Sequence, residues 1–548
     1  MRPFIDVRRL TTLVLAAALA ACGGTSSPST RVTSSAAPPA SPPAKVGPSA
    51  LSQAHGKPNL IMIMTDDQTV GDMMALPQTR QLLGGEGATF RNSFASWPLC
   101  CPSRATAFTG QYAHNHNVLG NYPPAGSFEA FINDGDTLPV RLQQAGYATT
   151  HIGKFLNGYG VDSRGMTYVP PGWAQWYGMV DPSTYQMWGY TINHNGQLKT
   201  YGRADVEDPA LYQTDVLRTI AIAEIDRYAE GTQPFFLSVA TLAPHEELGD
   251  VPKAGDQYPG PRPAPRHRNA FAGIQLPRPA NFDSANLYRK PGFVVQFAKA
   301  FAGESMEART SRYRRRLASL RAVDEAVAAI VQRLAALQLL DNTYILFTSD
   351  NGWFNGEHHI ALGKYLLYEP SIRVPLLLRG PGIPAGRSSD ELVANVDLAA
   401  TFVDLAGARA GHPLDGRSLM PYARDASLRT HRPILLDAPH EQAIKVVNGV
   451  PLAVVPAMRG LRTQRFAYFE HATGEVELYN MIEDPDQLKN AHEMPLYRDV
   501  EAAMHATLAR YARCVGATCR EDALSPAQPA VPTLNRLQRA PAPKAPAR

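Results

Sequence analysis

Cysteine is scarce in this sequence, with five residues among 548. So few cysteines in so long a chain do not form the disulfide framework of a small secreted scaffold, and each has to be interpreted individually. Net charge is also small, because 53 basic residues against 49 acidic ones leave a formal charge of +4. This balance is too small to indicate a nucleic-acid-binding surface, and we expect no nucleic-acid partner. No internal repeat is evident.

The N-terminus carries the features of an export signal. Arginines occupy positions 2, 8 and 9, and the apolar stretch Leu13–Leu19 is far too short to span a bilayer permanently. The tetrapeptide LAAC at 19–22 resembles a bacterial lipobox, in which the cysteine is lipidated after cleavage. We therefore expect a signal peptide over 1–21 and an exported bacterial lipoprotein, anchored through Cys22 and facing the periplasm or the cell exterior. The alternative is an ordinary secretory signal with an incidental cysteine.

Two segments have a composition that does not form a hydrophobic core. Residues 22–55 are rich in Pro, Ser and Ala and predict a tether, and residues 523–548 are similarly biased and predict a disordered tail. Between them the sequence predicts one continuous folded body.

Strand-like and helix-like segments alternate in this body. Three apolar runs of the kind found in strands buried on both faces are followed by polar residues; the runs are 60–64, 235–240 and 344–348. A long helical pattern over 311–340 precedes the third run. Because open α/β sheets build their sites where the carboxyl ends of strands converge, the sequence predicts an α/β fold with its chemistry at one edge of the sheet.

Carboxylates follow two of these runs. Asp66 and Asp67 end the first, and Asp350 and Asn351 end the third. Together they offer hard oxygen ligands, a set suited to Ca²⁺ or Mg²⁺. Taken alone, an Asp-Asp pair after a strand is more often a turn or a helix cap, and the second acidic strand end is what favours a metal site.

The segment from Leu99 to Arg104 reads LCCPSR. By thiol chemistry alone, Cys100 and Cys101 are open to three interpretations: packed core residues, a thiolate nucleophile, or half of a metal site. The pattern C-x-P-S-R within this segment resembles the maturation signature of the type I sulfatases, in which the first cysteine is oxidised to formylglycine (3-oxoalanine). By this resemblance the modified residue is Cys100, and Cys101 remains a reduced, packed thiol.

The resemblance extends from Pro58 to about Asn490. Its markers, in order, are PNLIMIMTDDQ, LCCPSRATAFTGQYAHNHNV, GKFLNGYG, APH, TSDNG, GKYLLYEPSIRVPLLLRGPG, ANVDLAATFVDLAG and ELYNMIEDPDQLKN. Within the family, the tandem cysteine, the His-Asn-His and GKFLNGYG look most similar to the N-acetylglucosamine-6-sulfatase branch. The resemblance implies an alkaline-phosphatase-like large mixed sheet flanked by helices in a catalytic domain over 56–430, and a smaller C-terminal sheet subdomain over 431–522.

The resemblance also implies roles for individual residues. Asp66, Asp67, Asp350, Asn351 and the modified Cys100 would hold one Ca²⁺, with Mg²⁺ as the second choice. Arg104 would orient the nucleophile, Lys154 and Lys364 would contact sulfate oxygens, and His245 would protonate the leaving alcohol. Leu156 stands where many sulfatases have histidine, which makes Asn157 a substitute polar contact, and His358 is a candidate substrate contact. Each lysine has the alternative of an ordinary solvated side chain, and His245 that of a capped loop histidine.

Two further cysteines lie near the end of the folded body. In an exported protein a disulfide between Cys514 and Cys519 is the expectation, whereas two buried free thiols would be typical of a cytosolic chain.

The function expected from the resemblance is sulfuric ester hydrolysis on a sulfated sugar similar to N-acetylglucosamine 6-sulfate, as found in glycosaminoglycans. Alternatives are an arylsulfatase of broad specificity, a phosphonate or phosphate monoester hydrolase of the same superfamily, and a catalytically inert lipoprotein that keeps the fold for binding. The expected partners are a sulfated carbohydrate and a formylglycine-generating maturation enzyme. Contact with the membrane is expected only through the lipid anchor.

Overall fold

The computed structural model describes residues 56–248, 260–283, 287, 289–300, 304–447 and 450–522. The predicted signal peptide, Cys22, the tether over 22–55 and the tail over 523–548 lie outside these ranges. Among the described helices, none combines the length and the apolar character needed to cross a membrane.

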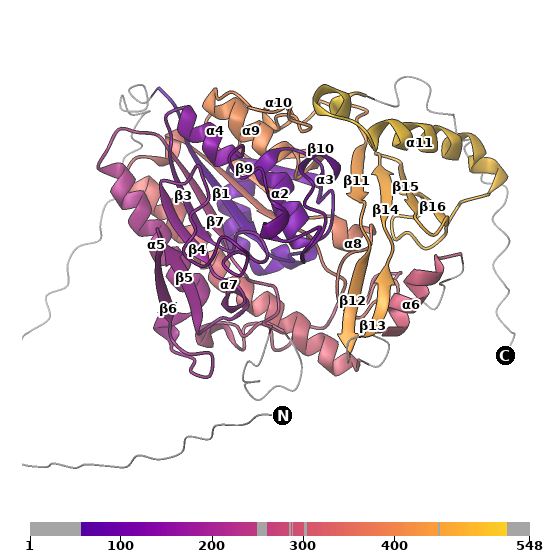
Figure 1. The fold of residues 1–548 in the computed structure, drawn as a ribbon, viewed down its shortest axis with the longest axis horizontal. Helices are drawn as coiled ribbons and strands as arrows, with labels where there is room; N and C mark the ends of the chain where they lie inside the picture. The colour runs from indigo at the N-terminus through magenta and orange to yellow at the C-terminus, as the bar shows by residue number, and fades with distance from the viewer. Residues whose placement is uncertain are drawn as a thin grey trace, which may run out of the picture. The chain divides into compact units, whose positions relative to one another are not determined.

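A ten-stranded mixed sheet forms the centre of the described body (Figure 1). Its strands lie in the spatial order β10 (Arg387–Ala394), β2 (Ala88–Phe94), β9 (Leu376–Arg379), β8 (Thr343–Ser349), β1 (Asn59–Thr65), β7 (Phe235–Ala240), β3 (Ala148–Gly153), β4 (Gln175–Met179), β5 (Tyr190–His194) and β6 (Gln197–Tyr201). The central strands β8, β1, β7 and β3 pair in parallel, in register along their length. The three apolar runs of the sequence are β1, β7 and β8, as predicted.

Helices cover both faces of this sheet because β1 is apolar on both sides. Ile61 and Ile63 pack with the long helices α5 (Gln213–Ala229) and α7 (Met306–Ala336), whereas Leu60 and Met62 pack on the opposite side. The elements on that opposite side are α2 (Cys100–Thr109), α4 (Leu138–Gln144), α9 (Asp397–Ala406) and α10 (Met420–Arg424). The helix predicted over 311–340 is α7, which begins at Met306 because the Ser305 side chain accepts a hydrogen bond from the Ala308 N–H.

A second, antiparallel sheet follows in the chain. Its order is β11 (Ile434–Ala438), β14 (Met458–Arg462), β15 (Phe466–His471) and β16 (Val476–Asn480), and β12 (Gln442–Val447) pairs with β13 (Val450–Val455) beside it. The remaining α-helices of the described residues are α1 (Pro77–Thr79), α3 (Ala113–His116), α6 (Gly292–Ala300), α8 (Glu369–Ile372) and α11 (Arg498–Tyr511). The predicted fold class, a large mixed sheet between helices with a small C-terminal sheet, is confirmed.

The C-terminal sheet shares a hydrophobic core with loops of the large domain. Leu436 and Phe469 of the sheet belong to the same buried cluster as Leu99, which precedes Cys100, and Leu366, which lies two residues after Lys364. Cys514 and Cys519, which follow α11, form a disulfide bond. The small sheet therefore packs against the segments that carry Cys100 and Lys364, two of the predicted site residues.

Candidate active site

The predicted site residues come together because four parallel strands are neighbours. Asp66 and Asp67 follow β1, Asp350 and Asn351 follow β8, His245 lies beyond β7, and Lys154 follows β3. Since parallel strands point the same way, their carboxyl ends deliver these side chains to one edge of the sheet. All of them are buried.

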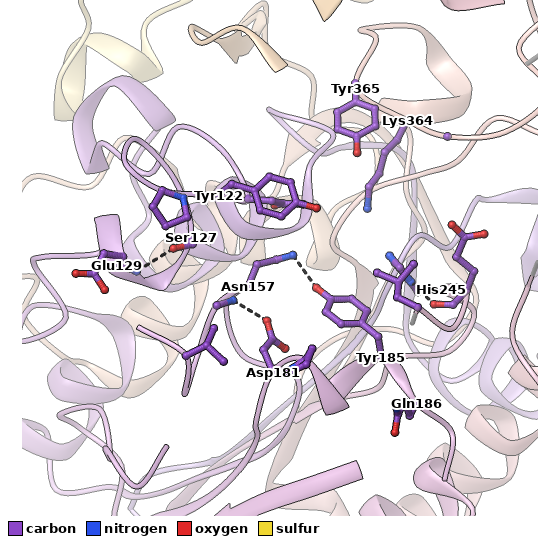
Figure 2. A pocket seen from close by; sticks show the side chains of 18 of the residues that line it. Tyr122, Ser127, Glu129, Asn157, Asp181, Tyr185, Gln186, His245, Lys364 and Tyr365 are labelled. Carbon is purple, nitrogen blue, oxygen red and sulfur yellow. Dashed lines mark hydrogen bonds between the residues drawn. The ribbon is translucent and has the colours of Figure 1, made fainter. Parts of the chain in front are cut away.

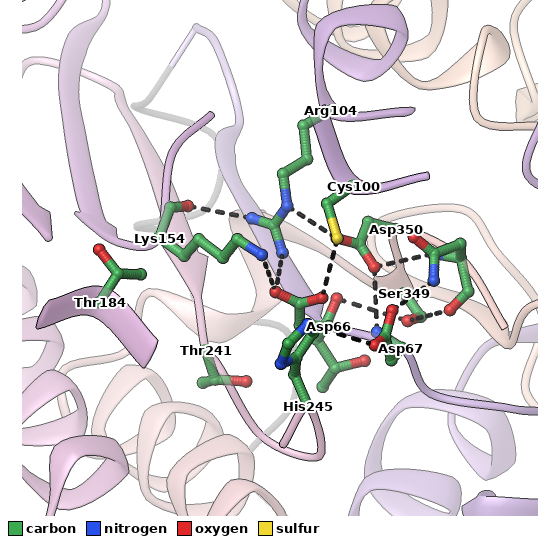
Figure 3. A network of polar contacts seen from close by, with 12 residues as sticks. Asp66, Asp67, Cys100, Arg104, Lys154, Thr184, Thr241, His245, Ser349 and Asp350 are labelled. Carbon is green, nitrogen blue, oxygen red and sulfur yellow. Dashed lines mark hydrogen bonds and ion pairs between the residues drawn. The ribbon is translucent and has the colours of Figure 1, made fainter. Parts of the chain in front are cut away.

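Cys100 is the first residue of α2 and faces this edge (Figure 3). Its Sγ lies 3.5 Å from Asp66 Oδ1 and 2.7 Å from Lys364 Nζ. Burial, followed by the charge of Asp66, raises the pKa of the Cys100 thiol to about 12. The start of a helix also favours negative charge, because the first-turn N–H groups and the helix dipole point there. An anion brought to Cys100 therefore meets both a lysine and a helix N-terminus.

Each aspartate of the pair after β1 has its own lysine. Lys154 Nζ donates to Asp66, and Lys364 Nζ donates to Asp67. Burial raises the pKa of Asp66, but Lys154, His245 and Arg104 together outweigh it and lower the pKa to about 2. Burial likewise opposes ionisation of Asp67, and Lys364 and His245 hold its pKa below the usual value. Both aspartates are therefore carboxylates.

Arg104 organises the same cluster from α2. Its Nε donates to Asp350 Oδ2 at 2.8 Å, one Nη donates to the Lys154 carbonyl at 3.0 Å, and the other lies 3.4 Å from Asp66 Oδ2 (Figure 3). Ser103 of the same signature donates to the Asp350 carbonyl and accepts from Asn395 Nδ2 at 2.9 Å. The S-R of the signature thus fixes the β8 loop against α2.

The donor set fits a hard divalent cation. Ligand atoms of Asp66, Asp67, Cys100 and His245 lie within 4.8 Å of one another, and Asp67 Oδ2 is buried without a hydrogen-bond partner. Asn351 Nδ2 donates to Asp67 Oδ1, which directs the amide oxygen of Asn351 toward Lys364 Nζ at 3.4 Å. Asp350 lies beside this group, and its Oδ1 accepts from the Asp67 N–H at 3.1 Å. The two carboxylates of the cluster supply the oxygen ligands that hard divalent cations prefer, and Asp350 and Asn351 lie in contact with Asp67 at its side.

His245 lies between the aspartates and open space. Its Nδ1 is 2.6 Å from the Glu246 carbonyl and its Nε2 is 3.5 Å from Asp67 Oδ2. A donor bond from Nδ1 to that carbonyl orients the ring with Nε2 toward the cluster. The Tyr185 ring packs beside it, with the ring centroids 5.2 Å apart, and also lies under Lys154 Nζ at 4.8 Å.

A cavity of about 1470 Å³ opens onto His245 and Lys364 (Figure 2). Asn157 lines it, and its Nδ2 donates to the Tyr185 hydroxyl at 2.7 Å. Asp181 lines it too and accepts from the Gly158 N–H at 2.6 Å. This volume is enough for a sugar-sized ligand.

His358 lies elsewhere. It is 1 % exposed and is not among the residues lining the cavity, and its ring packs on Tyr368 with centroids 4.3 Å apart. Its Nε2 is 3.5 Å from Asn281 Nδ2. The structure therefore brings the other predicted site residues to the cluster or the cavity and leaves His358 in the packing between the β8 loop and the C-terminal sheet.

Arg316, Tyr185 and Asp181 complete the site and are not anticipated by the motifs. Arg316, on α7, is 1 % exposed and donates to the Asp67 carbonyl at 2.5 Å and to the Pro244 carbonyl at 3.3 Å. It thereby ties the loop of Asp67 to the loop of His245. In the sequence it sits in a run of arginines, RYRRRL at 312–317, that resembles a solvated helix face.

The large mixed sheet flanked by helices, with a small antiparallel sheet after it, is an alkaline-phosphatase-like fold. The sequence model of the family described as Sulfatase matches residues 58–408, more than half of the chain. A model described as N-sulphoglucosamine sulphohydrolase, C-terminal, matches residues 356–513. The chain belongs to the sulfatase family, as its sequence motifs predict, and is a sulfuric ester hydrolase.

Individual relatives agree with this assignment. The chain is 34% identical to the N-acetylglucosamine-6-sulfatase of Homo sapiens, across 85% of this chain and 86% of that protein. It is 33% identical to the N-acetylglucosamine-6-sulfatase of Capra hircus, across 87% of each. Among solved structures, a protein in complex with its substrate D-glucosamine-2-N,6-O-disulfate superimposes with a TM-score of 0.65 at 24% identity, covering 83% of this chain and 97% of that one. The last comparison shows the shared fold.

Proposed function

We propose that this sulfatase uses a formylglycine made from Cys100, together with one bound Ca²⁺, to remove sulfate from a sugar similar to N-acetylglucosamine 6-sulfate. The observation that carries the proposal is the position of Cys100, which starts α2 within reach of Asp66 and Lys364 and stands in the C-x-P-S-R signature. The hydrated aldehyde supplies two hydroxyls on one carbon. One hydroxyl attacks sulfur while the bond from sulfur to the sugar oxygen breaks, and the sugar leaves as the alcohol after receiving a proton. The other hydroxyl then loses its proton, the aldehyde reforms and sulfate leaves.

The residues around Cys100 have the charges that such a reaction needs. Lys154 and Lys364 bring two ammonium groups to the edge where a sulfate would lie, and Arg104 holds the carboxylates of Asp66 and Asp350 in position. His245 presents Nε2 between this edge and the cavity, which supports a role as the proton donor to the leaving sugar oxygen.

Calcium is favoured for the cation because Asp66 and Asp67 supply carboxylate oxygens to the cluster, and the resemblance to sulfatases adds Asp350 and Asn351 to the oxygen ligands. When bound, it offsets negative charge on the sulfate oxygens and on the attacking group. Elemental analysis tests this assignment: the wild type should contain one calcium per chain. Asp67→Ala should lose it, whereas retention of calcium by that variant would exclude Asp67 as a ligand.

The sugar specificity is supported by relatives that share a third of their residues with this chain across most of its length. The cavity beside His245 offers polar contacts such as Asn157 for a ring hydroxyl or amide. We also propose that the protein is exported and anchored through Cys22, on the lipobox-like sequence alone.

The test is sulfate release by protein produced with a formylglycine-generating enzyme. N-acetylglucosamine 6-sulfate should be hydrolysed with multiple turnover, and a nitrophenyl sulfate should be turned over much faster than the matched phosphate. Cys100→Ser should abolish turnover because serine has one hydroxyl and cannot reform an aldehyde, whereas Cys101→Ala is the matched control and should keep substantial activity. A Cys100→Ser variant that turns over like wild type, or a preference for the phosphate ester, would contradict the proposal.

A further inference from the structure

The Tyr185 ring contacts two side chains of the proposed reaction at once. Lys154 Nζ lies 4.8 Å from the centroid of the ring. The His245 ring lies beside it, with the two centroids 5.2 Å apart and the two planes tilted by 51°. Tyr185 is 7 % exposed, so protein covers most of its surface.

These two neighbours connect the ring to the cluster around Cys100. Lys154 donates to Asp66, whose Oδ1 lies 3.5 Å from Cys100 Sγ. His245 Nε2 lies 3.5 Å from Asp67 Oδ2. A displacement of the ring would therefore shift the groups that face the reacting atoms.

The backbone around Tyr185, between β4 and β5, is bound to the loop that carries His245. The Tyr185 carbonyl accepts a hydrogen bond from the Leu248 N–H at 3.1 Å, and the Met187 N–H donates to Glu247 Oε1 at 2.7 Å. At the far end of the side chain, Asn157 Nδ2 donates to the hydroxyl (Figure 2). The ring is thereby held between the loop after β7 and the loop after β3.

An aromatic ring in this place has two physical effects. Its face attracts a cation, and the attraction is stronger when the cation is buried, as Lys154 is. Its contact with the imidazole restricts the orientations that His245 can adopt. The hydrogen bond from His245 Nδ1 goes to the neighbouring Glu246 carbonyl, on the same loop, whereas Tyr185 holds the imidazole from a different segment of the chain.

We infer that Tyr185 is a positioning residue for sulfate ester cleavage, and that its ring fixes Lys154 and His245 relative to each other. The inference rests on the proposed function, in which Lys154 contacts the sulfate and His245 protonates the leaving sugar oxygen. These two groups act at the two ends of the bond that breaks. Misplacing such groups by about 1 Å costs up to roughly 10²-fold in rate, so the ring should matter most where the leaving oxygen needs a proton.

The experiment measures kcat and KM for a series of sulfate esters whose leaving groups run from acidic phenols to the sugar alcohol of N-acetylglucosamine 6-sulfate. Wild type is compared with Tyr185→Phe, which keeps the ring, and with Tyr185→Leu and Tyr185→Met, which remove it. Thermal unfolding is followed for each variant. The methionine variant fills the space with an unbranched chain and decides the question if the leucine variant does not fold.

Tyr201→Leu is the matched control. Lys199 Nζ lies 4.8 Å from the centroid of the Tyr201 ring, which also stacks on Tyr190 with centroids 5.3 Å apart. Tyr201 thus makes the same two kinds of contact as Tyr185. It stands on β6 and is not among the described residues that line the cavity.

Tyr185→Phe and Tyr201→Leu should keep the wild-type dependence of log kcat on leaving-group pKa. Tyr185→Leu and Tyr185→Met should lower kcat for the sugar ester by roughly 10–100-fold, with a smaller change in KM, because the proton donor is misplaced. For a nitrophenyl sulfate the loss should be only roughly threefold, the contribution of one cation–π contact. The line for these two variants should therefore be steeper than that of wild type.

A double-mutant cycle separates positioning from general destabilisation. In the His245→Ala background, Tyr185→Leu should cost only the roughly threefold loss for both kinds of ester, because the proton donor is already absent. A wild-type slope in the leucine and methionine variants would overturn the inference. So would an equally large loss on the sugar ester in the His245→Ala background, or a loss in Tyr185→Phe as large as in Tyr185→Leu. In each of these outcomes, sulfate release by wild type leaves the proposed function intact, whereas failure of wild type to release sulfate from any ester would overturn the proposed function and the inference together.

Discussion

His245 and Asn157 lie next to the same cavity but have different chemistry. The imidazole can pass a proton from Nε2 to a leaving oxygen, whereas the amide can only hold a ligand in place. His245→Ala should therefore slow esters of poorly leaving sugar alcohols by roughly 10²–10⁴-fold and esters of acidic phenols much less. Asn157→Ala should weaken both kinds of ester similarly.

The measurement is a plot of log rate against leaving-group pKa for wild type and the two variants. A steeper slope for the His245 variant is expected. If its line runs parallel to that of the wild type, His245 contributes only binding, and the proton donor is another residue.

At the scale of single residues, the sequence identifies those that follow strands or stand in motifs. Asp66 and Asp350 could be predicted to meet because parallel strands end at one edge, whereas Lys154 was identified by the resemblance to sulfatases. Arg316 could not, because its role arises when α7 packs beneath two loops that are distant in sequence. His358 was a candidate substrate contact in the sequence, but in the structure its ring packs on Tyr368. No local sequence pattern indicates that contact.

The element that links the active-site loops is α7. Arg316 joins the carbonyls of Asp67 and Pro244 and also contacts Asp72 at 3.2 Å. Arg316→Lys places one compact ammonium where a planar guanidinium with several donors is needed. We expect a loss of roughly 10–100-fold in cation affinity and activity, the range found for residues that orient metal ligands.

Arg321→Lys is the matched control for this prediction. Arg321 lies on the same helix and also donates to a backbone carbonyl, that of Ala75, and to an aspartate, Asp324. Calcium titration and thermal unfolding are measured for both variants. Equal losses of calcium affinity in the two variants would show that Arg316 stabilises the helix and does not position Asp67.

At the element scale, the strands were predictable because β1, β7 and β8 are continuous apolar runs buried on both faces. The boundaries of elements depend on local caps. Ser305 caps α7, so the helix begins at Met306, before the start of the hydrophobic pattern at residue 311. The position of the C-terminal sheet follows from side chains on loops such as Leu99 and Leu366, whose burial depends on the tertiary structure.

For the molecule as a whole, a buried ionic network connects the C-terminal sheet to the loop after β8. Glu477 lies 2.9 Å from His471 Nε2, accepts from the Tyr368 hydroxyl at 2.7 Å and lies 3.7 Å from Lys290 Nζ. Burial raises the pKa of Glu477, but His471 and Lys290 outweigh it and lower the pKa from 4.5 to about 2. Stability from this group is therefore present above pH 4.5 and lost as the pH falls toward 2.

This shift corresponds to about 3 kcal/mol of unfolding free energy. Glu477→Gln should lower the free energy of unfolding at neutral pH. Between about pH 4.5 and 2, the free energy of unfolding of this variant should fall less steeply than that of wild type, as measured by urea unfolding across that range. Glu483→Gln, at an exposed position of the same region, should leave the free energy of unfolding at neutral pH and its dependence on pH unchanged. A decline in Glu477→Gln as steep as that in wild type would assign the acid sensitivity to other carboxylates.

The central claim, that Cys100 becomes the catalytic aldehyde, is tested most directly by the mass of the tryptic peptide NSFASWPLCCPSR, residues 92–104, from catalytically active protein. The account predicts a peptide lighter by the difference between one CH₂SH group and one CHO group, with fragmentation assigning the change to Cys100 and leaving Cys101 a thiol. Active protein in which every copy of this peptide keeps two unmodified cysteines would contradict the account.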